Sequence, residues 1–517
     1  MHEDIFFFFW KLFEVNCQSC AFLIFLAPFK KSPITCKWPI APSPFPIWPI
    51  LGSLPLLSKF PYISLYNLSK KYGDVMELRL GTTNVVVISS PKLAKEVLQT
   101  HDLVFATRGE NVIATMFSYG KKDVAWAPYG HDWLQMRKLC TLGLFTPKRL
   151  HASKKVRNEE ISCMVHEIFE HCKEGKSVNL KTMLTNTSLN MMTRLLFNKK
   201  YFSTKQFSTK ECEEFNRFLT EELHLHSLFN ISDYVSFLKP FDLQGFLPRG
   251  KKIHMKMDRF FDKILHDHQI EQKENVESKD FVDMLLSSSR VDNYNYTLDN
   301  NTIKGIINDM LNAGTDTTST TIEWALAELV KNPNIMKKTQ DELDHVVGHD
   351  RIVDEDDIPQ LKYLQAVVKE TFRLHVTIPL ITRECMTNCK VGGYDILAKT
   401  PIIVNIWAIH RHSSAYDNPW DFNPERFVGS GVDVKGVDFE LLPFGSGRRG
   451  CVGMPLGLMQ VQYELARLLH SFTWNLPIGE NPQNMDMGEV FGLTLPKVIP
   501  LEVIPIARLP LHMYGPL

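Results

Sequence analysis

One cysteine near the C-terminal end limits what this chain can fold into more than any other residue does. Cys451 lies in the segment Phe444-Gly-Ser-Gly-Arg-Arg-Gly-Cys-Val-Gly453, whose glycines allow tight turns and a close approach of the backbone to a flat ligand or to the sulfur. Pro455 predicts that a helix begins directly after the cysteine. The positive end of that helix and nearby backbone N–H groups would stabilise a thiolate, and Arg448 and Arg449 suit a cofactor that carries carboxylates.

On the local pattern alone, a buried structural thiol in a glycine-rich loop is an equally good interpretation. The whole segment, however, resembles the haem-binding signature of the cytochrome P450 superfamily position by position, at Phe444, Gly447, Arg449, Cys451 and Gly453. The resemblance implies a mainly α haem-thiolate fold with small peripheral β-sheets. It also implies that Cys451 is the thiolate ligand of the iron in haem b, with Phe444, Arg449 and Gly453 beside the cofactor.

The charge balance and the cysteines argue against other classes of protein. Lysine plus arginine and aspartate plus glutamate number 58 each, so no net field attracts nucleic acid. The ten cysteines are scattered, and no second CxxC pair joins Cys17 and Cys20 to make a zinc site. We therefore expect reduced and mostly buried thiols in a protein that faces the cytosol.

Residues 1–31 are expected to be a membrane anchor. Two apolar blocks, Ile5 to Phe13 and Ala21 to Phe29, together span about 25 residues, roughly the length of a tilted membrane helix. Polar residues within and between the blocks weaken insertion. Lys30 and Lys31 follow, and this charge asymmetry would leave the body of the protein on the cytoplasmic side. A cleaved signal peptide is the alternative, although no small-residue cleavage site precedes Lys30.

Residues 32–50 are predicted to be a stiff hinge, because six prolines at short spacing exclude a helix and favour an extended chain. A flexible linker is the alternative. Residues 51–517 are expected to form one catalytic domain. Strand patterns flank a turn at Gly81 to Asn84 and recur at 390–406 and 497–506, whereas helical patterns dominate 92–347 and return at 455–472.

Residues 302–331 are predicted to form one long helix with apolar residues on one side: Ile303, Ile306, Ile307, Met310 and Leu311. Its middle, Ala313-Gly-Thr-Asp-Thr-Thr318, contains poor helix formers, so we expect a local distortion that frees backbone carbonyls. A packing seam rich in Ser and Thr is the alternative. The family resemblance implies that Asp316 and Thr317 are the acid–alcohol pair that delivers protons during dioxygen activation.

Glu370 and Arg373 stand one helical turn apart in an apolar context, which predicts a buried ion pair rather than a surface pair. A buried pair needs further partners, and the resemblance implies that Arg426 supplies them. We interpret these three residues as structural and not as catalytic.

Trp133 and Arg137 place an indole N–H and a guanidinium on one helix face, where both are suited to a haem propionate. Arg383 is expected to supply a third contact. A stack of Trp on Arg at the surface is the alternative.

Several stretches, such as Ala127 to Trp133 and Phe491 to Pro496, resemble the plant A-type group of microsomal cytochromes P450. The group implies anchorage in the endoplasmic reticulum membrane by a single pass, with the catalytic domain in the cytoplasm. Two features depart from its pattern: Val376 and Thr377 stand where proline is usual, and His410 stands where glycine is common.

The resemblance implies a monooxygenase that uses dioxygen to hydroxylate a lipophilic phenylpropanoid, flavonoid or terpenoid. Electrons would come from NADPH through a separate NADPH-cytochrome P450 reductase, because the chain has no dinucleotide or flavin fingerprint. Lys138 and Arg448 are candidates for docking that reductase. Substrate contacts are expected from four segments: Asn111, Met116 and Phe117; Asn312, Ala313 and Thr317; Ile378 and Leu380; and Leu493 and Thr494.

Two other functions fit the same cysteine segment. One is a haem-thiolate isomerase or dehydratase that acts without a reductase, although such enzymes typically lack the acid–alcohol pair of Asp316 and Thr317. The other is a haem-binding paralogue without turnover, for which the altered Val376-Thr377 segment is the only support.

Overall fold

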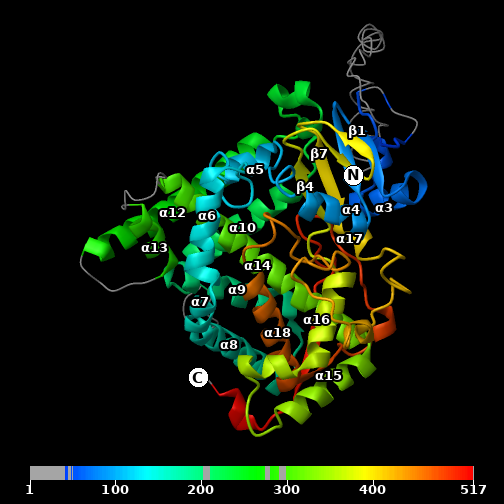
Figure 1. Cartoon of the computed structure of the whole chain (residues 1–517). Helices are drawn as coiled ribbons and strands as arrows, with labels where there is room; N and C mark the ends of the chain where they lie inside the picture. The colour runs from blue at the N-terminus through cyan, green and yellow to red at the C-terminus, as the bar shows by residue number, and fades with distance from the viewer. Residues whose placement is uncertain are drawn as a thin grey trace. The chain divides into compact units, whose positions relative to one another are not determined.

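The computed structural model describes residues 41–44, 48, 50–201, 210–273, 280–289 and 298–515. The expected anchor (1–31) and most of the expected hinge (32–50) lie outside these residues. Among the described residues, no helix combines the length and the apolar character needed to cross a membrane. The chain divides into unit 1 (Met1–Gly109, Phe229–Gln244 and Pro379–His412) and unit 2 (Glu110–Leu228, Gly245–Ile378 and Ser413–Leu517). Helices and small sheets make up both units, as predicted (Figure 1).

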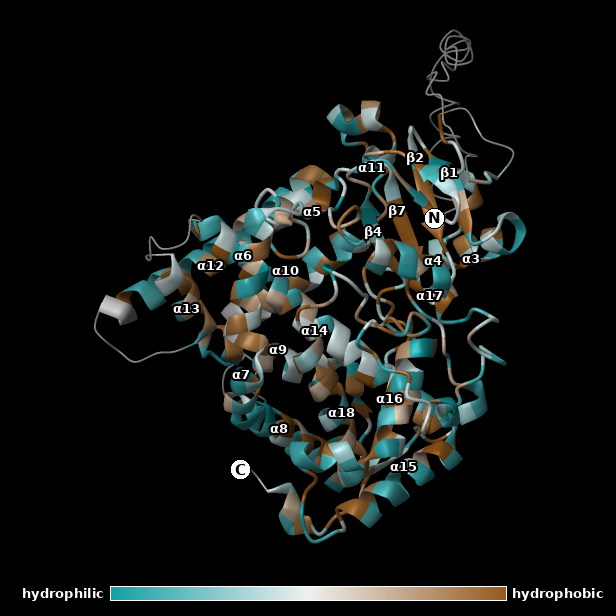
Figure 2. Ribbon diagram, viewed as in Figure 1, coloured by the Kyte–Doolittle hydropathy of each residue, from teal (hydrophilic) through white to brown (hydrophobic). Residues whose placement is uncertain are grey.

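A four-stranded sheet organises unit 1. Strands β1 (Val75–Leu80) and β2 (Thr83–Ile88) form the predicted hairpin, and β7 (Pro401–Asn405) and β4 (Leu380–Glu384) complete the order β1-β2-β7-β4. The turn is shorter than predicted, because Leu80 pairs directly with Thr83. Gly81 has φ +61°, and a Cβ there would lie 2.4 Å from the Tyr234 carbonyl oxygen, so glycine is required. Strand β7 is brown in Figure 2 because Ile402, Ile403 and Val404 are hydrophobic, and Ile402 and Val404 are also buried.

The other elements of unit 1 are short. A second hairpin consists of β5 (Cys389–Val391) and β6 (Tyr394–Ile396). The remaining helices and helical turns of the described part are η1 (Leu54–Leu56), α3 (Pro61–Tyr72), α4 (Pro91–Lys95), η2 (Glu96–Thr100), α11 (Ile231–Tyr234), η4 (Ser236–Phe241) and α17 (Ile406–Ile409). Proline begins both α3 and α4, where its missing N–H would have no helical partner in any case.

Unit 2 is mainly helical. Its described helices are α5 (Val112–Phe117), α6 (His131–Cys140), α7 (Pro147–Ala152), α8 (Lys154–Lys173), α9 (Leu180–Phe197), α10 (Lys210–Ser227), α12 (Phe246–Lys273), α13 (Phe281–Ser288), α14 (Asn300–Lys331), α15 (Pro333–Val346), α16 (Lys362–Leu374) and α18 (Met454–Ser471). Shorter turns are η3 (Thr141–Phe145), η5 (Glu355–Gln360), η6 (Pro424–Phe427), η7 (Pro482–Asn484) and η8 (Leu511–Tyr514). Helix α14 packs along α9 and α18 (Figure 1).

Helix α14 joins the two hydrophobic clusters of unit 2. The residues predicted to be its apolar side, from Ile303 to Leu311, are buried in one cluster with α9, α10, α12 and α13. Its C-terminal half, from Ile322 to Val330, is buried in the other cluster with α8, α16 and α18. The helix is therefore enclosed over most of its length, which is unusual for a segment with so many polar residues.

The predicted distortion of this helix is wrong, because α14 is a continuous α-helix from Asn300 to Lys331. Packing overrides the weak propensity of the central residues. A Cβ on Gly314 would lie 2.6 Å from the Met192 sulfur, so glycine lets α9 approach closely. The hydroxyls of Thr317 and Thr321 donate to the carbonyls of Ala313 and Thr317 within the helix.

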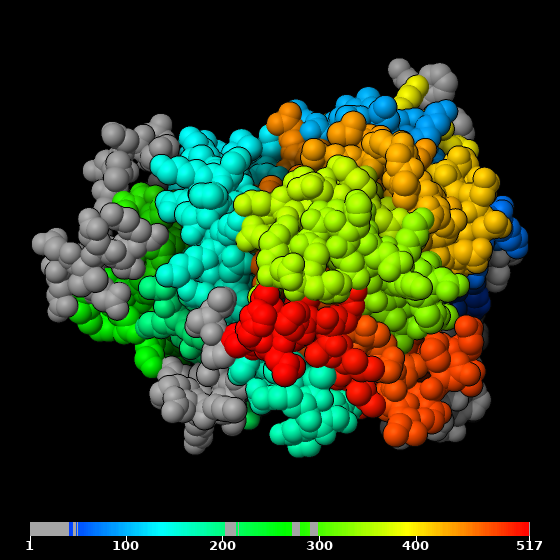
Figure 3. All heavy atoms as spheres, turned by 90° about the horizontal axis from the view of Figure 1, so that it is seen from below, coloured from blue at the N-terminus to red at the C-terminus, as the bar shows by residue number. Residues whose placement is uncertain are grey.

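The C-terminal segment packs onto unit 2. Strand β9 (Glu502–Ala507) lies between β3 (Val178–Asn179) and β8 (Phe472–Asn475) in a three-stranded sheet. Beyond it, the ring of Tyr514 stacks on Phe169 at 4.2 Å, and Arg508 pairs with Asp344 at 2.8 Å. Figure 3 shows this red segment beside the yellow-green region of α15.

The predicted ion-pair trio is confirmed. Arg373 Nε lies 2.7 Å from one carboxylate oxygen of Glu370, and both side chains are fully buried. Arg426 Nε lies 3.1 Å from the other oxygen, and Arg373 also donates to the carbonyls of Pro419 and Asp421. These extra partners satisfy the buried charges and tie α16 to η6.

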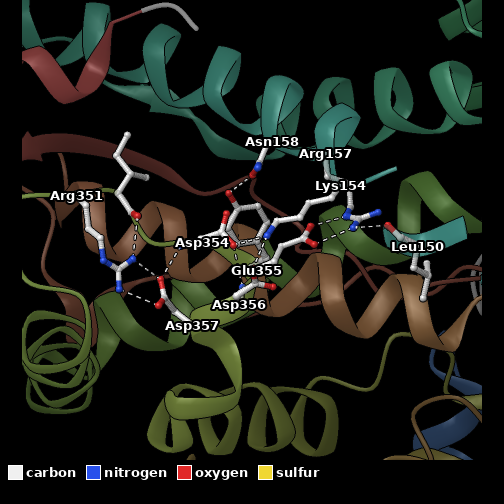
Figure 4. Close-up of polar contacts among 11 residues, drawn as sticks. Leu150, Lys154, Arg157, Asn158, Arg351, Asp354, Glu355, Asp356 and Asp357 are labelled. Carbon is white, nitrogen blue, oxygen red and sulfur yellow. Dashed lines mark hydrogen bonds and ion pairs between the residues drawn. The ribbon is translucent and has the colours of Figure 1, made fainter. Parts of the chain in front are cut away.

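A second charged network joins α8 to the acidic turn η5 (Figure 4). Arg157 binds both carboxylate oxygens of Glu355 at 2.5 and 2.8 Å, and its side chain is fully buried. Lys154 bridges Asp354 and Asp356. Arg351 donates twice to Asp357 and holds the pKa of that carboxyl below its usual range. Four adjacent acidic residues can share this turn because cations face them on both sides.

We predict that Arg157→Ala lowers the free energy of unfolding by about 3–5 kcal/mol, because it leaves the Glu355 carboxylate buried without its partner. Lys155→Ala on the same helix is the matched control: Lys155 is 86% exposed, so its loss should change stability by less than about 0.5 kcal/mol. Guanidinium unfolding followed by circular dichroism measures both. Equal effects of the two variants would contradict the account of this network.

Candidate functional site

The segment before Cys451 forms a tight loop, as its glycines predict. The amide N–H of Cys451 donates to the Phe444 carbonyl at 2.8 Å, and that of Gly450 donates to the Gly447 carbonyl at 2.9 Å. Gly445 and Gly447 have φ near +66° and +69°, a conformation that side chains disfavour. The Phe444 ring packs edge-on against Phe372, with centroids 5.4 Å apart. The loop is thus fixed at both ends while the cysteine side chain stays accessible.

Helix α18 begins three residues after the cysteine, with Gly453 as its N-cap and Pro455 in its first turn, as predicted. The amide N–H groups of Gly453 and Met454 and the charge of Arg137 lower the pKa of the Cys451 thiol. Desolvation by the surrounding protein is the larger influence and raises that pKa above its ordinary value. The predicted stabilising groups are therefore present, but in this structure desolvation outweighs their effect on the pKa of the Cys451 thiol.

Arg449 and Trp133 meet over the loop at Val124. The Arg449 guanidinium lies 4.1 Å above the indole ring and donates to the carbonyls of Val124 and Ala127. The indole N–H of Trp133 donates to the same Val124 carbonyl at 2.9 Å. This arrangement differs from the prediction that the indole N–H faces a propionate, because a backbone acceptor already takes that proton.

Arg137 lies close enough to Cys451 for their charges to interact, and its guanidinium sits 5.5 Å from the Trp133 ring. Lys138 and Arg448 are exposed, and Arg448 donates to the Tyr129 hydroxyl. Arg383 lies on β4 of unit 1, where it is buried and donates to the Thr382 carbonyl.

Two carboxyl groups that the sequence analysis missed hold the loop that receives Arg449. Asp309 on α14 accepts the backbone N–H groups of Val124 and Ala125 at 2.7 and 2.9 Å. Asp123 accepts those of Trp126 and Ala127 at 2.8 and 2.9 Å. Desolvation, and after it the neighbouring Asp123, raise the pKa of Asp309 well above its usual range.

The sequence carried one signal for this pair. Asp309 interrupts the apolar stripe between Ile306 and Met310, where a charged residue needs a partner. Its partner, Asp123, is nearly two hundred positions away and no spacing rule connects the two.

The polar residues in the middle of α14 face different partners. Asp316 accepts from Lys181 at 3.3 Å and from the Thr494 hydroxyl at 2.5 Å. Thr494, expected to contact substrate, is buried and bonded to Asp316 in this structure. Thr317 is half-buried, and Ala313 is exposed although it lies in the middle of a long helix.

A polar chain runs from α10 to the accessible part of α14. Asn308 donates to the buried Glu222 carboxylate at 2.7 Å, and Asn312 donates to Asn308 at 3.2 Å. The Asn312 side-chain oxygen is buried and has no hydrogen-bond partner among the described residues. An unused acceptor one position before Ala313 is suited to a ligand hydroxyl.

The remaining predicted substrate residues have mixed environments. Asn111 caps α5 by accepting from the Ala114 N–H at 2.7 Å, and Phe117 is buried beside the ring of His226. Ile378 and Leu493 of unit 2 are exposed, Met116 is half-buried, and Leu380 lies half-buried on β4 of unit 1.

The unusual residue Thr377 has a specific partner. Its hydroxyl lies 3.0 Å from that of Thr321 on α14, and its carbonyl accepts the Leu495 N–H. The neighbouring Val376 is buried. His410, the other departure, is fully buried in unit 1.

Comparison with known proteins identifies the family of this arrangement. Residues 42–501 match the family described as Cytochrome P450. The chain is 41% identical to a flavonoid 3'-monooxygenase of Crocosmia x crocosmiiflora over 95% of this chain and 96% of that one. It is 41% identical to a flavonoid 3',5'-hydroxylase of Eustoma exaltatum subsp. russellianum, with 92% of each chain covered. A flavonoid 3'-monooxygenase of Arabidopsis thaliana is 40% identical over 92% of this chain and 93% of its own.

Solved structures agree on the fold. A zebra fish cytochrome P450 with abiraterone superposes with a TM-score of 0.72 at 26% identity, covering 87% of this chain and all of that one. The mainly α cytochrome P450 fold with small sheets is therefore confirmed.

We predict that Asp309→Leu speeds hydrogen exchange at the amides of Val124 and Ala125 on the order of tenfold or more, because each unpaired buried donor costs about 1–3 kcal/mol. Asp309→Asn keeps an acceptor oxygen and should change exchange much less. Exchange measured by mass spectrometry on peptides covering residues 122–127 separates the two variants. Unchanged exchange in the leucine variant would show that Asp309 does not hold this loop.

Proposed function

The chain belongs to the cytochrome P450 family, and from this premise we propose that its substrate is a flavonoid-type phenolic compound. The enzyme is a haem-thiolate monooxygenase, which uses dioxygen, an organic substrate and a reductase partner. One observation carries the substrate proposal: flavonoid hydroxylases are about two-fifths identical to this chain along more than nine-tenths of its length.

The residues around Cys451 fit a thiolate-ligated haem. The sulfur is accessible, the amides of Gly453 and Met454 act on it, and Arg137 lies near it. We propose that Cys451 ligates the iron of haem b, that Phe444 and Gly453 shape the ligand side, and that Arg137, Arg383 and Arg449 interact with the propionates. The role proposed for Trp133 is to position Arg449, whose guanidinium stacks on the indole ring. When bound, the haem supplies reductive activation of dioxygen, which a thiolate ligand favours.

The polar residues of α14 are proposed to move protons to the reaction. Thr317 keeps its hydroxyl on the helix by donating to the Ala313 carbonyl, so its oxygen can accept a proton from the accessible side. Asp316 is held by Lys181 and Thr494, which fix the carboxylate beside the threonine.

Substrate recognition is proposed to centre on Asn312. Its unpaired side-chain oxygen can accept a phenolic hydroxyl, and the chain through Asn308 to Glu222 holds the amide in that orientation. The exposed side chains of Ala313, Ile378 and Leu493 offer apolar contact for the rings. Asn111, Met116, Phe117 and Leu380 are proposed to complete the wall, and Thr494 to contribute through Asp316.

We further propose electron supply by NADPH-cytochrome P450 reductase, docked at the exposed Lys138 and Arg448. Residues 1–31 would anchor the enzyme in the endoplasmic reticulum membrane with the catalytic part in the cytoplasm.

The proposal is tested by incubating the haem-loaded full chain with the reductase, NADPH, ¹⁸O-labelled dioxygen and a panel of flavonoids. We expect a product that carries one labelled oxygen and forms only with NADPH. Failure to hydroxylate any flavonoid would overturn the substrate class. A product formed without NADPH would instead support the isomerase or dehydratase.

We predict that Asn312→Leu weakens binding of the accepted flavonoid on the order of tenfold, because the substrate hydroxyl loses its acceptor. Binding is measured from the change in haem absorbance on titration. The matched control is a methyl ether of the same substrate, which should bind wild type and variant equally. If the variant binds the free phenol as tightly as wild type does, Asn312 is not the acceptor.

A further inference from the structure

Two cysteines in unit 1 lie side by side although the monooxygenase reaction does not use them. Among the cysteines whose burial the structure describes, Cys140 and Cys385 are buried, Cys172 and Cys389 are half-buried, and Cys163 and Cys451 are exposed, so the expectation of mostly buried thiols is wrong for these residues. Cys385 Sγ lies 3.8 Å from Cys389 Sγ. A disulfide needs the sulfurs to approach to about 2.0 Å, so the two atoms have to move closer by somewhat less than 2 Å.

The backbone on both sides of this pair is fixed. The backbone N–H of Cys385 donates to the Thr400 carbonyl at 2.9 Å, and the Cys385 carbonyl accepts the Lys399 N–H at 2.6 Å. Cys389 begins β5 and pairs with Ile396. Between them, the Met386 N–H donates to the Val104 carbonyl, and Asn388 accepts the Ala398 N–H. The two thiols are therefore held close by the fold and do not meet by chance collision.

The two thiols differ in environment. Cys385 is fully buried, and its thiol lies 2.9 Å from the Thr387 carbonyl. Cys389 is half-buried, so a small oxidant can reach it. The neighbouring Cys385 lowers the pKa of the Cys389 thiol, whereas Cys389 and burial raise the pKa of Cys385. A partly accessible thiol beside a fully buried one is the arrangement of an attacking and a resolving cysteine.

We propose that Cys385 and Cys389 are a redox modification site that hydrogen peroxide converts reversibly to a disulfide. In the first step, the Cys389 thiolate attacks peroxide, the O–O bond breaks, and sulfenic acid and hydroxide form; the hydroxide takes up a proton to give water. In the second step, the Cys385 sulfur attacks the sulfenic sulfur, a second water leaves, and the S–S bond forms. Two thiols are oxidised by two electrons and one peroxide is reduced to two waters.

The source of the oxidant rests on the haem ligation proposed above. A monooxygenase that reduces dioxygen releases hydrogen peroxide when the electrons do not reach the substrate. A transient disulfide is the form expected for a redox-sensing pair in a reducing compartment. The pair also closes the connection from β4, which carries Leu380 and Arg383, to β5. Oxidation would thus stiffen the end of a strand that bears two proposed active-site residues.

The sequence allows a direct test. Trypsin cleaves after Arg383 and Lys390, releasing the peptide from Glu384 to Lys390, which contains both cysteines and no other. The haem-loaded full chain is treated with hydrogen peroxide, its free thiols are blocked with N-ethylmaleimide, and the peptides are weighed without reduction. We expect an unlabelled peptide lighter by two hydrogens, restored by dithiothreitol, and formed on the order of tenfold faster than oxidation of the exposed Cys163. Oxidation of Met386 is distinguished because it adds an oxygen.

Two variants identify the attacking sulfur. Cys389→Ser should leave Cys385 reduced, and Cys385→Ser should leave a sulfenic acid on Cys389 that dimedone traps. If Cys385→Ser prevents folding because position 385 is buried, the wild-type peptide and the Cys389→Ser variant still test whether the disulfide forms and which sulfur attacks. A peptide that stays doubly labelled while Cys163 is oxidised would overturn the proposal, as would oxidation of Cys385 at an unchanged rate in Cys389→Ser.

Discussion

Burial of helix α14 between two hydrophobic clusters is the constraint on which unit 2 depends. Its first half packs with α9, α10, α12 and α13, and its second half packs with α8, α16 and α18. Because side chains enclose it on most sides, several of its polar residues find partners within the protein. Asp309, Asn308, Asp316 and Thr321 each do so in a different direction. The helix that resembles a catalytic element is also the main organiser of the fold.

From this helix, a chain of polar contacts leads to the cysteine loop. Asp309 fixes the backbone at Val124, and the Val124 carbonyl accepts from both Trp133 and Arg449. Arg449 is two residues from Cys451, whose loop is closed by its own hydrogen bond to Phe444. The position of the sulfur thus depends on a carboxyl group on α14. Packing keeps α14 rigid, and hydrogen bonds to backbone groups fix where the Val124 and Cys451 loops lie.

The sequence predicted those features that local pattern determines. The loop glycines, the helix after Cys451, the apolar stripe of α14 and the Glu370–Arg373–Arg426 trio are all confirmed, because spacing or a specific motif encodes each of them. The distortion at Gly314 was predicted wrongly, since propensity does not reveal that Met192 packs against that glycine. The roles of Asp123 and Lys181 could not be predicted, because their partners on α14 are distant in sequence. The indole N–H of Trp133, which we expected to face a haem propionate, donates to the Val124 carbonyl in this structure.

The central claim, that Cys451 holds haem iron through its thiolate, is tested most directly by the spectrum of the reduced enzyme with carbon monoxide. The full chain should show the red-shifted Soret band of thiolate-ligated haem. Cys451→His should lose that band while retaining haem, and Cys163→Ser, at an exposed cysteine elsewhere in unit 2, should keep it. A folded, haem-loaded wild type without the band, or a histidine variant that retains it, would contradict the assignment of Cys451.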